Sequence, residues 1–291
     1  PPRSTLFPYT TLFRSDLRGA NLENADLSGA DLSGADLSGA NLSNANLSTA
    51  DLNSTKLNAA NLNHANLTNT IIRDAQLNNT DLSHAILFSA NLSDTLLERA
   101  NLQYADLCRT DLSGANLQYA NIKGANISDS ILFSTNLEHA VLLSTDLSYA
   151  KLNGAQLAES TLQNAILIGA DLSGANLIRA VLHQGDLSGV NLSEADLTQA
   201  DLREVVLLGT DLSSTKLNEA NLSASNLCGA ILNHADLTHA NLTQSILSDA
   251  DFSYANLEQI IWNEQQEWQE VRGLGKAINV PSALQNPMDS D

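Results

Sequence analysis

The chain has little of what an ordinary globular domain is built from. No proline occurs between Pro8 and Pro281, and aromatic residues make up only 4% of the 291 residues. A mixed aromatic core is therefore excluded, and Leu and Ala must supply most of any core. No window holds 18 consecutive apolar residues, which excludes a transmembrane helix.

Basic residues are also scarce. The chain has 14 Lys and Arg against 33 Asp and Glu, for a formal net charge of −19. Binding to phosphate groups needs clustered Lys and Arg. DNA, RNA and anionic membrane surfaces are therefore disfavoured as direct ligands.

What the chain does contain is a repeat of five residues that begins at Asp16. A central apolar residue recurs at every fifth position from Leu17 to Leu257, which gives 49 repeats without an insertion, and 45 of these residues are Leu. Two positions earlier stands a small residue, such as Ala20, and between them usually Asp or Asn. Two residues follow, often Ser-Gly. The central exceptions are Ile72, Ile122, Ile127 and Phe252.

A period of five selects the kind of structure. In a helix, five residues advance by roughly 500°, so the Leu side chains would point in every direction. In a flat strand, side chains alternate with period two, so each step of five would move Leu to the opposite face. The chain must therefore turn a corner within each repeat. Gly and Asn at the last position suit a type II turn, whose second central residue needs a positive φ.

The segment Ala25-Asp26-Leu27-Ser28-Gly29 resembles the motif of the pentapeptide-repeat family, and the resemblance covers residues 16–262. This Ala-Asp-Leu-Ser-Gly form of the repeat most resembles the repeats of cyanobacterial members of the family. The resemblance implies an all-β fold, a right-handed quadrilateral β-helix with four repeats in each coil. Residues 16–262 would then form about twelve coils, stabilised by contacts between neighbouring coils.

The two ends depart from the repeat. Residues 1–15 resemble one reading frame of a common short-read sequencing adapter, so we interpret them as a non-native leader that precedes an unknown native N-terminus. We expect this leader to stay outside the ladder of backbone hydrogen bonds. After residue 262, apolar residues recur at a spacing of three in Trp268, Val271 and Leu274. This spacing predicts a short amphipathic helix over 263–280 that caps the solenoid, followed by a loose tail over 281–291.

We find no catalytic, cofactor-binding or metal site in the sequence, and we expect no enzyme. With about twenty residues per coil, Cys108 and Cys228 would lie roughly 29 Å apart, beyond the reach of a disulfide. Unpaired thiols favour a reducing compartment, so we expect the cytoplasm. His64 and His84 fall in one column with Tyr104. Two His residues lack the further ligands that zinc needs, which favours a surface ladder over a metal site.

A second column predicts another surface ladder. It holds alternating charged, aromatic and amide residues, within which Glu159 and Arg179 can pair across coils. Its members are Arg99, Tyr119, His139, Glu159, Arg179, Gln199 and Glu219.

Some repeats carry apolar residues on both sides of the central Leu, where the side chains would face outward. Clustered apolar surface marks contact regions, although drift of the repeat explains these residues equally well. The candidate interaction surface comprises Val141, Leu143, Ile166, Ile168, Val181, Val206 and Leu208.

Two hypotheses of function follow. The first is a structural scaffold that binds an unknown protein partner, or a second copy of itself through the cap or an exposed face. The second is a DNA-mimicking binder of a type II topoisomerase, as in some members of the resembled family. Residues 16–262 carry a net charge of −18. Over an expected length of roughly 58 Å this is one charge per about 3.2 Å, against about 1.7 Å in B-DNA, which favours the scaffold.

Overall fold

The computed structural model describes residues 12–263, 268 and 270–285. The chain divides into two compact units, Pro1–Lys151 and Leu152–Asp291, and each is described by itself. In both units the five-residue period is the building unit of the fold, and four repeats make one coil.

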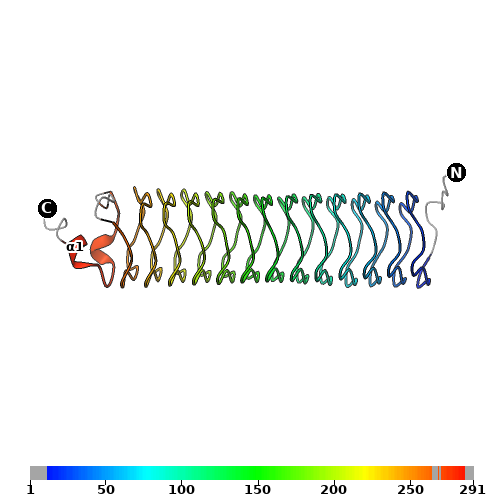
Figure 1. The fold of residues 1–291 in the computed structure, drawn as a ribbon, viewed down its shortest axis with the longest axis horizontal. Coiled ribbons are helices and arrows are strands. Elements are labelled where there is room, and N and C mark those ends of the chain that lie inside the picture. The colour runs from blue at the N-terminus through cyan, green and yellow to red at the C-terminus, as the bar shows by residue number, and fades with distance from the viewer. Residues whose placement is uncertain (1–11, 264–267, 269, 286–291) are drawn as a thin grey trace. The chain divides into compact units, whose positions relative to one another are not determined.

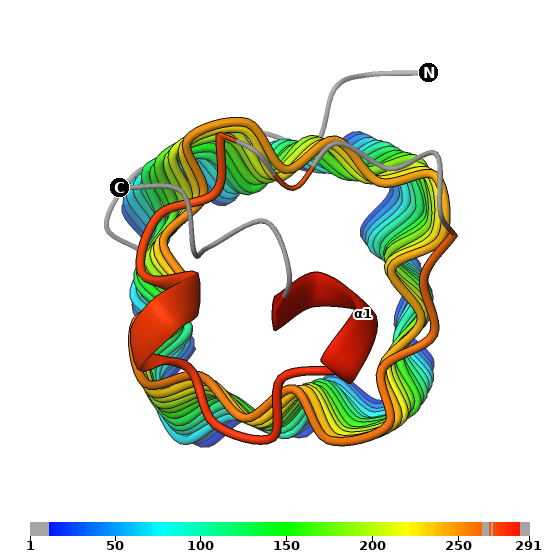
Figure 2. The same ribbon diagram turned by 90° about the vertical axis from the view of Figure 1, so that its left-hand side faces the viewer.

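Within the coils of each unit, a residue before a central Leu pairs in parallel with the residue twenty positions later. Asp26 bridges Asn46 in the first unit, and Asp186 bridges Val206 in the second. The coils recur as even turns in Figure 1, and their four sides are visible end-on in Figure 2. The predicted right-handed quadrilateral β-helix is therefore confirmed for each unit. We number the four sides of a coil in chain order, so that Leu17 lies on side one, Leu22 on side two, Leu27 on side three and Leu32 on side four.

A tight turn at the end of every repeat makes each corner. On side one the amide of Ala20 donates to the carbonyl of Leu17 at 3.0 Å. The second residue of the turn has a positive φ in every repeat from Arg14 to Gln259, for example 64° at Gly19 and 57° at Asn24. This confirms the predicted turn, and it shows that many side chains other than glycine adopt the left-handed conformation.

The interior is filled by the central Leu residues and by the small residues that precede them. Leu37 and Leu57, in one column of side one, have 0% of their surface exposed, as predicted. Where Thr replaces Ala, its hydroxyl stays satisfied without water. Thr55 Oγ1 donates to the carbonyl of Leu52 at 2.7 Å, and Thr55 is fully buried.

The prediction for the leader is wrong for residues 12–15. The Leu12 amide donates to the Asp31 carbonyl at 2.7 Å, and that of Arg14 to Ser33 at 3.0 Å. Backbone pairing needs no particular side chain, and Leu12 falls in the central column, so the segment continues the coil. Residues 1–11 lie outside the described part of the chain.

The prediction of a helix over 263–280 is wrong for its described part beyond residue 269. The 3-10 helix η1 spans only Leu274–Lys276. On either side of it the chain continues the ladder, since Arg272 bridges Asp251 and Ile278 bridges Asn256. A spacing of three also fits a 3-10 helix, and the backbone groups of the preceding coil need partners.

A short helix lies within the segment that we predicted to be a loose tail. Helix α1 spans Ser282–Gln285, and its Leu284 is only 4% exposed. In Figure 2, α1 lies inside the four-sided outline, and Figure 1 places it beyond the coils of the second unit. Trp268 is also buried, with its ring centroid 5.7 Å from that of Phe252. Apolar side chains therefore cover the last coils of this unit. Neither η1 nor α1, the helices of the described residues, is long enough to cross a membrane.

Candidate interaction surface

The preference for Asp or Asn before the central Leu has a local cause. In each repeat, backbone carbonyls accept from most of the amides, but the amide directly after the central Leu has no backbone partner. Asp26 supplies one, because its Oδ1 accepts from the Ser28 amide at 3.2 Å and from the Ser28 hydroxyl at 2.7 Å. A residue in this column that cannot accept a hydrogen bond therefore leaves that amide without its local acceptor. After Ile71, the Oδ1 atom of Asn53 in the preceding coil accepts from the Arg73 amide instead, at 3.1 Å.

The apolar residues of the candidate surface stand in this column and two positions after it. Ile166 and Leu208 are 42% and 41% exposed, whereas Val206 and Ile168 are half-buried. Among the described residues, neither the Ile168 amide nor the Leu208 amide has a hydrogen-bond acceptor. Ile166 and Val206 thus each give up the hydrogen bond that Asp or Asn makes at this position.

The structure brings only part of the predicted surface together. Ile166 and Val206 lie on side three of the second unit, with Asp186 between them as the bridging partner of both. Val181 lies on the neighbouring side two and is half-buried. Val141 and Leu143 are half-buried residues of side two in the first unit.

The sequence prediction missed apolar residues on sides three and four of the second unit. Ile246 on side three is 53% exposed and Ile231 on side four is 39% exposed. Both stand in the column before the central Leu, but the residue after that Leu is polar, so a search for flanking apolar pairs passes over them. Stacking the sequence in rows of twenty would have found them.

The second unit has an uneven distribution of charge. Its Lys and Arg residues within 152–262 lie on sides one and two, and each is paired. Arg179 lies 3.6 Å from Glu159, Arg203 lies 2.6 Å from Asp201, and Lys216 lies 3.0 Å from Asp196.

Sides three and four of the same segment, with the corners that end them, hold carboxylates and no Lys or Arg. Burial of Asp171 opposes ionisation, but hydrogen bonds from Asn153, Ser173 and Asn191 outweigh it and lower its pKa. Among the Asp, Glu, Lys and Arg side chains of 152–262, these two sides therefore carry only acidic ones. The carboxylates are Asp171, Asp186, Glu194, Asp211, Asp249 and Asp251.

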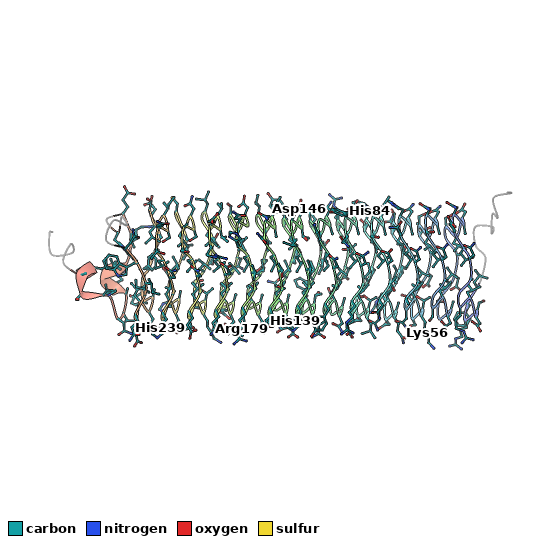
Figure 3. All side chains as sticks on the ribbon, viewed as in Figure 1. Lys56, His84, His139, Asp146, Arg179 and His239 are labelled. Carbon is teal, nitrogen blue, oxygen red and sulfur yellow. The ribbon has the colours of Figure 1, made fainter. Side chains whose placement is uncertain are left out.

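The predicted ring ladder forms on the surface of the first unit. The ring centroids of His64 and His84 are 4.8 Å apart, and those of His84 and Tyr104 are 5.3 Å apart. In Figure 3 the His84 side chain points away from the coil. Among the described residues no group of three or more His, Cys, Asp or Glu could hold a metal ion. Cys108 and Cys228 are free and half-exposed.

The predicted column of alternating side chains also forms ladders. In the first unit the Arg99 guanidinium lies 5.3 Å from the centre of the Tyr119 ring, which stacks on His139 at 4.8 Å. In the second unit Gln199 Nε2 donates to Glu219 Oε2 at 2.8 Å. Arg179, whose side chain points outward in Figure 3, pairs with Glu159 as predicted. These exposed contacts stabilise neighbouring coils and build no site.

Comparisons with known proteins agree on the repeat. A family model described as pentapeptide repeats matches the chain in 8 copies. No curated protein sequence matches it. The matched residues are 15–53, 50–87, 90–129, 132–164, 155–193, 191–229 and 220–259.

Solved structures of several repeat proteins are similar to the chain. HetL, a pentapeptide repeat protein involved in heterocyst differentiation regulation from the cyanobacterium Nostoc, is 34% identical, with 84% of this chain and 91% of HetL covered and a TM-score of 0.27. Rfr23 from the cyanobacterium Cyanothece is 36% identical, with 34% and 64% covered and a TM-score of 0.24. Trypsin-treated QnrB1, a plasmid-mediated fluoroquinolone resistance protein, is 20% identical, with 67% and 89% covered and a TM-score of 0.31.

Proposed function

The chain belongs to the pentapeptide-repeat family, and on that premise we propose that it is a non-enzymatic scaffold that presents an interaction surface to a protein partner. In this proposal the coils hold the surface side chains in fixed columns. The surface is the set of apolar residues on the second unit, Ile166, Ile168, Val206 and Leu208, with Val181 beside them. Val141 and Leu143 are proposed as further contact residues, on the first unit.

One observation carries this proposal. An apolar residue before the central Leu exposes hydrocarbon and leaves an amide without its usual acceptor, as at Ile166 and Ile168. Both effects disfavour the isolated fold, and Asn at the same position would remove both. Residues that break a local rule without a local gain are typical of functional surfaces.

The proposal includes an organisation of the chain. Residues 16–262 form the solenoid of about twelve coils. Residues 263–291 close its end, and residues 1–15 are a leader foreign to the native protein. A second copy of the chain, bound through the closing segment or an exposed face, is included among the proposed partners, and the cytoplasm is the proposed compartment.

The test adds charge to the surface and leaves the interior intact. Ile166→Asp with Val206→Asp should abolish the sedimentation-detected self-association of the purified chain, or its cross-linking to a co-purifying partner from the source organism. Asp restores an acceptor for the next amide but also stacks on Asp186, so the two effects oppose each other and the melting temperature should stay nearly the same. Asn176→Asp with Asn221→Asp, on sides one and two, is the matched control for added charge. An unchanged association in the first variant would rule out this surface.

The topoisomerase hypothesis remains a second candidate because of the negative charge on sides three and four. Under this candidate, changing the acidic column of side four to Asn should abolish binding to a type II topoisomerase, while Ile166→Asp with Val206→Asp should have little effect. Under the scaffold proposal the two variants give the opposite results. The side-four carboxylates to be changed are Asp111 in the first unit and Asp171, Asp211 and Asp251 in the second.

A further inference from the structure

The corner between sides three and four of the second unit has no side chain at the second residue of its turn. In four successive coils its turn residue is glycine, with φ of 66° at Gly169, 65° at Gly189, 61° at Gly209 and 67° at Gly229. A Cβ atom built on Gly189, Gly209 or Gly229 would meet no atom within 4 Å. Nothing therefore stands between this corner and an approaching molecule.

Apolar side chains border this corner on both sides. Ile168 and Leu208 precede its glycines on side three, and Ile231 stands at the start of side four. The amides of Ile168 and Leu208, which have no partner among the described residues, are directly next to the glycines. The corner therefore offers aliphatic contacts together with open hydrogen-bond donors.

The charge around the corner selects the partner. Asp186 on side three and Asp171 and Asp211 on side four surround the apolar side chains, while every Lys and Arg of 152–262 is paired on the other two sides. A cationic partner gains attraction here, and an anionic one is repelled. The carboxylates and the aliphatic side chains alternate along the coils, so the partner must present cationic and aliphatic side chains on the same surface.

We propose that this glycine corner, with Ile166, Ile168, Val206, Leu208 and Ile231, docks a basic amphipathic helix of a partner protein. The proposal rests on the proposed function and names the class of partner. Ile168 and Leu208 are two coils apart, which is about 9.6 Å. Residues i and i+7 of a helix are about 10.5 Å apart along its axis. A helix that lies along the corner can therefore place successive aliphatic residues against both, with Lys or Arg toward the carboxylates.

Hydrogen bonding adds a requirement. The amides of Ile168 and Leu208 are donors, so the apolar face of the helix should carry Gln or Asn near its aliphatic residues, whose side-chain carbonyls can accept. The bare glycines let the helix approach closely enough for this contact.

The test uses the full chain and a synthetic peptide of about fourteen residues, with Leu every three or four positions, Gln beside the Leu residues and Lys elsewhere. Fluorescence anisotropy of the labelled peptide should show saturable binding. The variant Ile168→Ser with Leu208→Ser, and separately Asp186→Asn with Asp211→Asn, should each weaken binding at least tenfold. Asp196→Asn with Asp236→Asn, on side one, removes the same charge elsewhere and should change binding less than twofold. Matching melting temperatures show that the variants are folded.

Each outcome decides the proposal. Equal weakening by the side-one control would mean that only overall charge attracts the peptide, and the docking site would be rejected. Equal binding of a peptide with Glu in place of Lys, or no binding of either, would reject the basic helix as the partner. The proposed scaffold function would still stand if Ile166→Asp with Val206→Asp abolished the chain's own association. If that variant also had no effect, both would fail.

Discussion

Asn46 Nδ2 donates to Asp26 Oδ1 at 3.1 Å, from one coil to the preceding one on side three. The same Asp26 oxygen accepts from the amide and the hydroxyl of Ser28. One carboxylate therefore satisfies its own turn and the next coil. Two Asp residues stacked in this way would leave two charges without a donor between them, which accounts for the rarity of stacked Asp pairs. The bridged Asp pairs are Asp16 with Asp36 and Asp31 with Asp51.

The first prediction concerns acid. Hydrogen bonds from Ser28, Ser33 and Ser38 lower the pKa values of Asp26, Asp31 and Asp36. Because these folded-state pKa values lie below the ordinary value of about 3.9, the stabilisation is present above that pH and is lost as pH falls through the lower values.

Replacing the three residues with Asn keeps the acceptor oxygens and removes the titration. Between about pH 5 and pH 2, the melting temperature of the triple variant should therefore fall by less than that of the parent protein. Thermal unfolding followed by circular dichroism measures this. An equal loss in both proteins would contradict the assigned role of these carboxylates.

The second prediction tests the turn backbone. Gly174 has a φ of 63° and open space around it, so Gly174→Ala should destabilise by about 1 kcal/mol through backbone strain alone. Ala59 has a φ of 56° at the equivalent corner position, so Ala59→Gly should be neutral or stabilising by up to about 1 kcal/mol. Urea unfolding of the two variants gives both values, and opposite signs are the expected result.

The third prediction compares the interior with the turn surface. Leu137 is fully buried, and Leu137→Ala should cost about 2–5 kcal/mol because neighbouring coils cannot collapse into the space left behind. Ser128→Ala removes a hydroxyl that donates to Asn126 Oδ1 at 2.7 Å on the partly exposed turn, and it should stay within about 0.5 kcal/mol. Chemical denaturation measures the free energy of unfolding of both variants. Similar losses in the two would contradict the assignment of Leu137 to the interior and of Ser128 to the surface.

The fourth prediction concerns the stability that the fold loses because position 166 carries an exposed Ile instead of Asn. Ile166→Asn should raise stability by about 0.5–1.5 kcal/mol, because Asn supplies the acceptor that the Ile168 amide lacks. Asn176→Ile on side one is the reverse control, since the Asn176 Oδ1 accepts from the Ile178 amide at 3.2 Å, and it should lower stability. Differential scanning calorimetry on both variants is sufficient.

The fifth prediction follows from residues 12–15. A chain that begins at residue 12 keeps the hydrogen bonds of Leu12 and Arg14 and the bond from the Asp36 amide to the Ser15 carbonyl at 2.9 Å. A chain that begins at residue 16 loses them. The longer version should melt at a higher temperature, whereas equal melting temperatures would show that these residues add nothing to the coil.

The five-residue period was enough to predict the interior of both units. Central Leu residues such as Leu37 repeat without an insertion, and only a chain that turns in every repeat can bury them all. The period could not predict the ends, because pairing of Leu12, Arg272 and Ile278 depends on free backbone groups of an adjacent coil and not on side-chain type.

The candidate surface was predicted in part for a similar reason. Apolar pairs such as Ile166 and Ile168 are visible along the sequence. The glycine corner from Gly169 to Gly229 is visible only after the coil length is known, because its members are twenty residues apart. The missing hydrogen bond of the Ile168 amide could not be predicted without knowing that Asp or Asn normally supplies it.

The coil of twenty residues also constrains how such a gene can change length. A duplication of five residues between Ile168 and Asp186 would fit the ladder, but it would rotate everything after it by a quarter turn. Val206 and Leu208 would move to side four while Ile166 and Ile168 stayed on side three. A duplication of twenty residues would keep all four on one side, one coil further apart. The fold therefore tolerates insertions or deletions of five residues, but only insertions or deletions of twenty residues keep the surface side chains on the same side of the coil.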